Sequence, residues 1–270
     1  RPSAYRITLK GSVMGQGESY PNMYLAINPG RVTMQLPGNV TSDPAFGLPA
    51  VWIESSLRET AQINGYTVVD ASTVVTTHIN HLIHSNAAEL LGRQELQKLL
   101  DHLTVQSPKL IEDLVPKLLP LSTVQKVLQN LLEESVHIRD MRTIIDVLID
   151  NATRTQDAVE LTVFVRNALG RAISEQYFPA GAELQVMSLH HELENILLQV
   201  MQTGSGIEPG LADTLLKEAQ IAASHQEKLG LPIVLLVPSS IRQLLAKFLR
   251  RVLPQLKVLS HSEIPDTRKI

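Results

Sequence analysis

The hydrophobic and polar positions of the first ninety residues alternate between two periods. A spacing of two, which predicts strands, recurs in residues 5–9, 23–27, 50–53 and 66–69. A spacing of 3.6 predicts helices over residues 54–64 and 70–91, the second capped by Asp70 or Ser72. Residues 34–43 form a loop with a short strand. This mixture of strands and helices predicts an α/β or α+β unit.

The pattern then changes twice. Residues 93–171 carry only helical periodicity, which predicts a helical unit with helices at 94–104, 109–115, 122–132, 140–150 and 160–177, Ser122 and Asp140 serving as caps. Residues 178–270 alternate again, with strands at 184–189, 232–237 and 256–260 and helices at 191–202, 208–229 and 240–252. The expected fold is therefore a mixed α/β N-terminal part, a helical middle and a small α/β C-terminal part.

Composition narrows the possible functions. The net charge is −3 and aromatic residues make up 4%, which argues against a basic or stacking surface for nucleic acid. Without cysteine, thiolate metal sites and thiol nucleophiles are excluded. The longest apolar run has five residues, whereas a membrane span needs about 20. Because the chain begins with Arg1, we expect it to be a fragment.

The motifs that suggest catalysis or cofactors are weak. His78, His81 and His84 follow one another at three-residue intervals, but their directions around a helix diverge, so surface or capping histidines are favoured over a metal site. The two Gly-x-Gly pairs, at 15–17 and 204–206, are interpreted as turns, since neither extends to a nucleotide-binding fingerprint. Without a P-loop or nucleophile elbow, we expect no catalytic residues, no metal and no cofactor.

The predicted helix 239–253 carries Arg242, Lys247, Arg250 and Arg251 and no acid. Its apolar stripe indicates an ordinary amphipathic helix. An acidic partner surface is the alternative use of these charges.

One loop is unusual. Phe46 lies between Pro44 and Gly47 in a segment outside any periodic element, close to Asp43. A loop aromatic beside a carboxylate suits a shallow apolar recess with a polar anchor for a partner. The alternative, in which Phe46 folds inward as a plug, is equally compatible with the sequence.

At this loop the chain resembles the type III secretion export-gate family, in particular its flagellar FlhA branch. The resemblance runs in order through nearly the whole chain, at residues 24–30, 43–48, 65–75, 77–78, 89–95, 108–116, 124–132, 138–142, 169–171, 208–212 and 248–251.

The resemblance implies a cytoplasmic domain of a bacterial inner-membrane protein, joined to the membrane through an N-terminal region absent here. Such domains assemble into a ring, nonameric in the family, and dock export chaperones carrying late substrates as well as other export-apparatus components. They help to switch export between substrates and are not enzymes.

The resemblance also implies four subdomains. These comprise residues 1–21 with 71–90, an inserted 22–70, a helical 91–170 and an α/β 171–270, the first lacking its opening part. The chaperone-binding dimple would take Asp43, Phe46 and Thr77, with apolar walls from Ile27, Pro29, Val69 and Val74. Phe46 and the walls would then desolvate an apolar chaperone residue, while Asp43 and Thr77 satisfy polar groups at the rim.

Two alternatives stay open. The homologous gate of a virulence injectisome shares the architecture. A hydrolase or nucleotide-binding domain built on residues 178–270 is a remote alternative from another class.

Overall fold

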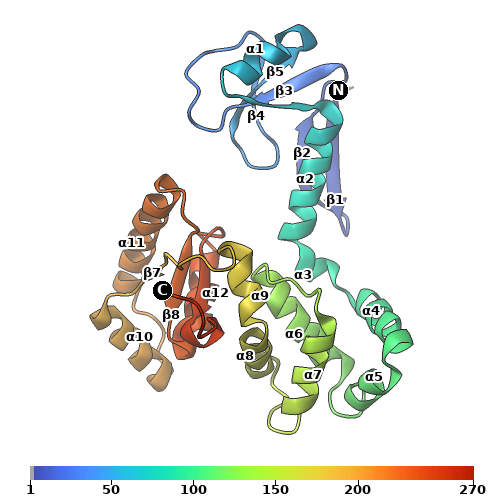
Figure 1. Cartoon of the computed structure of the whole chain (residues 1–270), viewed down its shortest axis with the longest axis vertical. Helices are drawn as coiled ribbons and strands as arrows, with labels where there is room; N and C mark the ends of the chain where they lie inside the picture. Colours follow the sequence, from blue (N-terminus) through green and yellow to red (C-terminus); the bar gives the residue numbers. More distant parts are fainter. Residues whose placement is uncertain (1–2) are drawn as a thin grey trace. The chain divides into compact units, whose positions relative to one another are not determined.

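The computed structural model describes residues 3–270. By its contacts the chain divides into two compact units, residues 1–90 and 91–270, coloured blue to turquoise and green to red in Figure 1. The finer division into four subdomains stays a prediction.

Unit 1 contains two sheets. An antiparallel hairpin joins β1 (Ala4–Leu9) to β2 (Ser12–Glu18). The second sheet has the antiparallel order β4-β5-β3-β6. Its strands are β3 (Met23–Ile27), β4 (Asn39–Ser42), β5 (Pro49–Glu54) and β6 (Thr67–Asp70).

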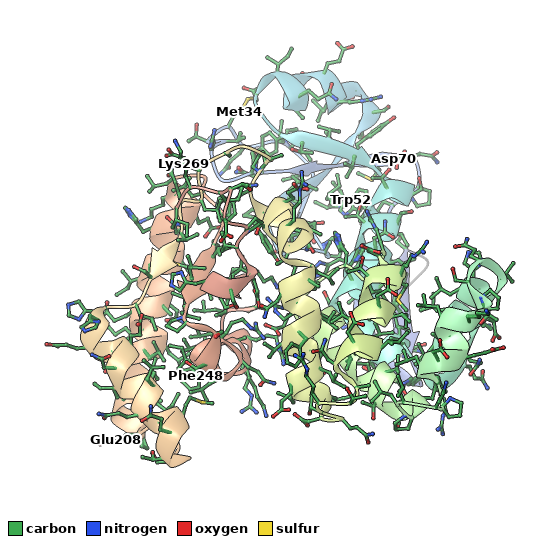
Figure 2. The ribbon with its side chains drawn as sticks, turned by 60° about the horizontal axis from the view of Figure 1, so that its bottom comes forward. Met34, Trp52, Asp70, Glu208, Phe248 and Lys269 are labelled. Carbon is green, nitrogen blue, oxygen red and sulfur yellow. The ribbon has the colours of Figure 1, made fainter. Side chains whose placement is uncertain are left out.

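The four-stranded sheet buries both faces. On one face, Ala26 and Ile53 pack against η1 (Ser55–Leu57) and α1 (Arg58–Ile63). On the other face, Leu25 and Trp52 pack against Val74 of α2 (Ala71–Ser85), and Trp52 is labelled in Figure 2. Adjacent residues of a strand point to opposite faces, so β3 supplies both clusters.

Helix α2 begins where the sequence indicates, because the Asp70 carboxylate accepts a hydrogen bond from the Thr73 N–H at 2.7 Å. It ends earlier than expected, at Ser85, and the short α3 (Ala87–Leu90) follows Asn86. Figure 1 shows α2 running along the β1–β2 hairpin.

The expectation that the glycine pair at 15–17 forms a turn is wrong, because both glycines lie inside β2. A Cβ at Gly15 would lie 2.7 Å from Nε2 of His78, and one at Gly17 would lie 2.7 Å from Oη of Tyr5. The strand therefore needs glycine for close packing rather than for turning.

Unit 2 opens with a helical array that shares one apolar core. Its helices are α4 (Arg93–Gln106), α5 (Pro108–Leu114), α6 (Leu121–Glu133), α7 (Met141–Asn151), α8 (Ala158–Ala168) and α9 (Gly170–Tyr177). Asp140 caps α7 as predicted, whereas Pro120 rather than Ser122 precedes α6.

The single helix expected over 160–177 is two helices that meet at Leu169. The next residue, Gly170, has no room for a Cβ against the Glu263 carbonyl. The break thus lies where the C-terminal segment packs against the helices.

The rest of unit 2 is a three-stranded parallel sheet with helical crossovers. Along the chain come β7 (Met187–Ser188), α10 (His191–Thr203), α11 (Pro209–Lys228), β8 (Val234–Val237), α12 (Ser239–Arg250), β9 (Lys257–Ser260) and η2 (His261–Glu263). Strand β7 is shorter than the expected strand 184–189. Val234 and Leu236 face the helical core, whereas Leu235 and Val237 face α12, so the sheet is buried on both sides.

Candidate functional site

The loop between β4 and β5 holds the first two candidate residues. The backbone N–H of Asp43 donates to the Leu48 carbonyl at 2.7 Å, and that of Gly47 donates to the Asp43 carbonyl at 2.8 Å. Gly47 has φ = +71°, a conformation that favours glycine. The Asp43 carboxylate also accepts the Phe46 N–H, at 2.8 Å.

These bonds place the two candidates very differently. Asp43 is only 5% exposed and its carboxylate organises its own loop, as Asp commonly does in turns. Phe46 is 64% exposed, so it is not the inward plug that the sequence left open. A large exposed aromatic on an ordered turn is typical of a partner anchor.

Helix α2 faces this loop. The Phe46 ring meets the His81 ring edge to face, with centroids 5.0 Å apart and an interplanar angle of 66°. On the same side of α2, three and four residues earlier, lie the buried His78 and the half-buried Thr77.

Three of the four apolar residues predicted to line the docking site lie in one cluster. Ile27, Val69 and Val74 belong to one cluster, in which Val74 is buried and the other two are partly buried. Ile27 pairs with Ala50 across the sheet, so the end of β3 lies at the same sheet end as the loop. Pro29 is exposed beyond that strand end.

Tyr5 of β1 contacts the buried His78 of α2, an interaction that the sequence did not indicate. The Tyr5 hydroxyl and Nδ1 of His78 form a hydrogen bond of 2.8 Å, with the rings edge to face. Burial lowers the pKa of His78, His81 adds to this, and Asp43 opposes it. Burial, with a smaller contribution from Asp43, raises the pKa of Tyr5. The sequence shows the spacing of the three histidines, but it does not show that the β1–β2 hairpin packs against His78.

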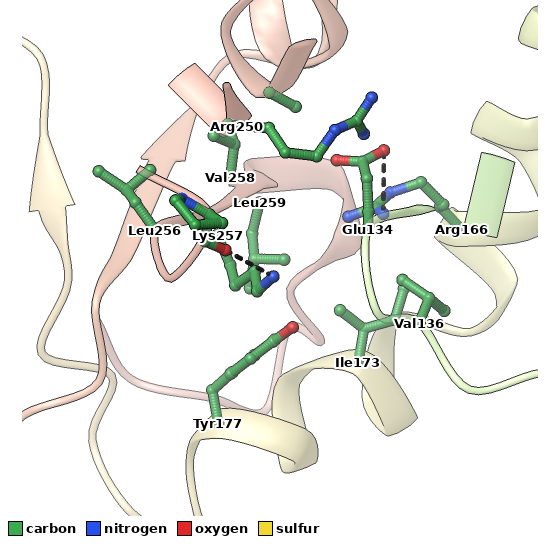
Figure 3. Close-up of a pocket in the computed structure, with 12 residues that line it drawn as sticks. Glu134, Val136, Arg166, Ile173, Tyr177, Arg250, Leu256, Lys257, Val258 and Leu259 are labelled. Atoms are coloured by element: carbon green, nitrogen blue, oxygen red, sulfur yellow. Dashed lines mark hydrogen bonds and ion pairs between the residues drawn. The ribbon is translucent and has the colours of Figure 1, made fainter. Parts of the chain in front are cut away.

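Unit 2 contains a second cluster of charged groups (Figure 3). Arg166 binds Glu263 through two hydrogen bonds of 2.7 and 2.9 Å, and Arg242 binds Glu134 through two of 2.7 and 3.0 Å. Arg166 Nη1 lies 3.7 Å from Glu134, which joins the two pairs.

One cavity beside this network, the one drawn in Figure 3, is small. Its volume of about 20 Å³ has room for roughly one water molecule. Burial raises the pKa of Tyr177, which lines it, to about 12, so the hydroxyl stays protonated. The network joins α8, α12 and η2 through buried ion pairs.

Two further features were sought in residues 3–270: a metal site and a membrane-spanning helix. The described part of the chain contains no group of three His, Cys, Asp or Glu side chains placed to hold a metal ion. Nor does any described helix combine the length and apolarity that crossing a membrane requires.

Comparison with known proteins agrees with this fold. The FHIPEP family model matches residues 1–269. The flagellar biosynthesis protein FlhA of Escherichia coli strain K12 is 58% identical over 270 residues, covering all of this chain and 39% of that protein. The chain thus spans about two fifths of the length of this curated relative.

Structures similar to this chain come from related secretion proteins. The Chlamydia pneumoniae CdsV protein superposes with a TM-score of 0.83 at 25% identity, covering 99% of this chain and 78% of that one. The nonameric EscV cytosolic domain from the type III secretion system has a TM-score of 0.72 at 25% identity, covering 100% and 81%. The fold is therefore that of a type III secretion export-gate cytoplasmic domain. The chain belongs to the FHIPEP family, and its relatives include flagellar FlhA proteins.

Proposed function

We propose that this chain is a docking platform of the flagellar type III export gate. In this role it binds export chaperones carrying late substrates and helps to order and switch their export. The observation that carries the proposal is Phe46, an exposed aromatic on an ordered turn at the sheet end where the partly buried Ile27 lies. The family supports it, because flagellar biosynthesis proteins are its high-identity relatives. The function is docking rather than catalysis and uses no cofactor.

In this proposal the exposed and partly buried residues contact the chaperone, and the buried Asp43 supports them. Phe46 and the partly buried Ile27 and Val69 desolvate an apolar residue of a chaperone helix. Thr77 satisfies a polar group at the rim. Asp43 acts indirectly, since its carboxylate is already bonded to the Phe46 N–H and holds the turn.

Calorimetric titration with a flagellar filament-type chaperone–substrate complex tests this role. We expect Phe46→Ala to weaken binding strongly and Asp43→Ala to weaken it less, with the thermal midpoint of Phe46→Ala unchanged. The matched control is Ile63→Ala, which removes an 85% exposed aliphatic side chain from α1, on the opposite face of the sheet. Equal binding by all four proteins would place docking elsewhere.

The platform would function as a ring on the cytoplasmic side of the bacterial inner membrane. The structurally similar EscV cytosolic domain is nonameric, which supports a ring for this chain as well. Analytical ultracentrifugation at increasing concentration would show cooperative growth toward nine copies. A strictly monomeric species throughout would count against ring formation by this chain.

An injectisome role is the second candidate, because CdsV and EscV share the fold. It predicts binding of an injectisome chaperone complex and none of the flagellar one. The 58% identity to FlhA, against 25% to either of these proteins, favours the flagellar role.

A further inference from the structure

We propose that His81 is a positioning residue of the docking site, which holds the Phe46 ring in the pose that a partner meets. This inference rests on the proposed docking function and adds to it a residue that acts through Phe46 rather than on the partner.

The first step is the exposure of Phe46. Its side chain is 64% exposed, whereas its backbone is fixed by the Asp43 carboxylate and the turn. An exposed side chain on a fixed backbone still samples several rotamers, and a partner must select one of them on binding. A contact that holds the ring in the bound rotamer beforehand therefore raises affinity.

The second step is the ring contact. The Phe46 ring contacts the His81 ring at a centroid distance of 5.0 Å and an interplanar angle of 66°. Edge-to-face pairs of this kind change equilibria by about two- to tenfold beyond the area they bury. His81 thus offers a directional restraint that an aliphatic residue at this position would not give.

The third step is the rigidity of the support. His81 follows His78 by one turn of α2, and His78 is buried and bonded to the Tyr5 hydroxyl. Gly15 packs so closely on His78 that even a Cβ would collide with it. The helix face that carries His81 is therefore held by the β1–β2 hairpin, and Phe46 rests on a fixed partner.

A double-mutant cycle with the chaperone–substrate complex tests the inference. We expect His81→Ala to weaken binding about two- to tenfold, and His81→Phe, which keeps an aromatic ring, to restore it. In a Phe46→Ala background, His81→Ala should cause no further loss. The control is His84→Ala, which removes an exposed histidine one turn further along α2. Wild-type affinity in His81→Ala, equal weakness of His81→Phe, or additive losses would each overturn the proposal.

A second readout needs no partner. In protein labelled with ¹³C in its phenylalanine rings, the Phe46 resonance, assigned through Phe46→Ala, should shift in His81→Ala because the neighbouring ring current is lost. An unmoved resonance would overturn the positioning role. If the wild type binds no chaperone complex while the resonance shifts as expected, the docking function fails and the ring restraint stands.

Discussion

His78 illustrates how a buried group can give a folded unit a dependence on pH. Burial, reinforced by His81, lowers its pKa below the ordinary value of 6.5, whereas Asp43 opposes the shift. The unfolded chain therefore binds a proton more readily than the folded chain just below pH 6.5, and unfolding becomes easier as the pH falls.

The corresponding prediction concerns stability against pH. Below pH 6.5, the wild type should lose up to about 1.4 kcal/mol per pH unit relative to a His78→Gln variant. Chemical denaturation of both proteins between pH 7.5 and 5.5 measures this difference, since other titrating groups cancel in the comparison. Parallel stability curves would show that His78 does not titrate differently on folding.

Gly15 tests the packing behind the docking site. Gly15→Ala places a Cβ 2.7 Å from both His78 Nε2 and Leu82 Cδ1, so we expect a loss of about 1–3 kcal/mol in unfolding free energy. Gly210→Ala is the matched control, because the added Cβ meets no atom within 4 Å outside the neighbouring residues and backbone of its own helix, and α11 favours alanine. Thermal unfolding of the two variants and the wild type measures this difference. A thermal midpoint of Gly15→Ala equal to that of the wild type would contradict the close packing.

The sequence predicted that the loop around Phe46 is a candidate site, but it did not predict the separate roles of Phe46, Asp43 and His81. Phe46 and Asp43 both stood out as a loop aromatic beside a carboxylate, yet one is exposed and the other buried. Which oxygen meets which N–H depends on the backbone of the turn, and residue spacing alone does not specify that. The spacing of the three histidines distinguished a metal site from surface or capping groups, and it did not indicate that His81 contacts the Phe46 ring.

At the scale of elements, periodicity predicted most helices and strands and missed those defined by tertiary packing. Strand β2 was missed because its glycines reflect close tertiary contacts, Gly15 with α2 and Gly17 with Tyr5 of β1, and not local propensity. The break between α8 and α9 likewise reflects the close approach of η2 at Gly170, some ninety residues further along the chain. Basic helix α12 was ambiguous until the structure placed Arg242 against Glu134 and Arg250 near Glu133.

The buried ion pairs that join these elements give a prediction at the same scale. Glu134→Gln should lower the unfolding free energy by about 3–5 kcal/mol, because the single carboxylate of Glu263 then faces two buried guanidinium groups, those of Arg166 and Arg242. Glu133→Gln, which affects an exposed pair with Arg250, should change it by less than about 1 kcal/mol. Urea unfolding measures the unfolding free energy of both variants. Equal losses in Glu134→Gln and Glu133→Gln would argue against a structural role for the buried network.

At the scale of the whole molecule, each unit carries its own core. The clusters of residues 25–74 lie entirely within unit 1, and those of residues 91–264 entirely within unit 2. Domains with separate cores can unfold separately, and every proposed docking residue lies in residues 1–90. Stability of the docking site should therefore depend on unit 1 and not on the ion pairs of unit 2.

Differential scanning calorimetry of the intact chain tests this independence. We expect two transitions, of which Gly15→Ala lowers only one and Glu134→Gln only the other. In a chaperone titration run between the two midpoints of Glu134→Gln, binding should persist if unit 1 unfolds second and vanish if it unfolds first. A single transition lowered by both substitutions would mean that the units unfold together, and the docking site would then depend on the packing of the entire chain.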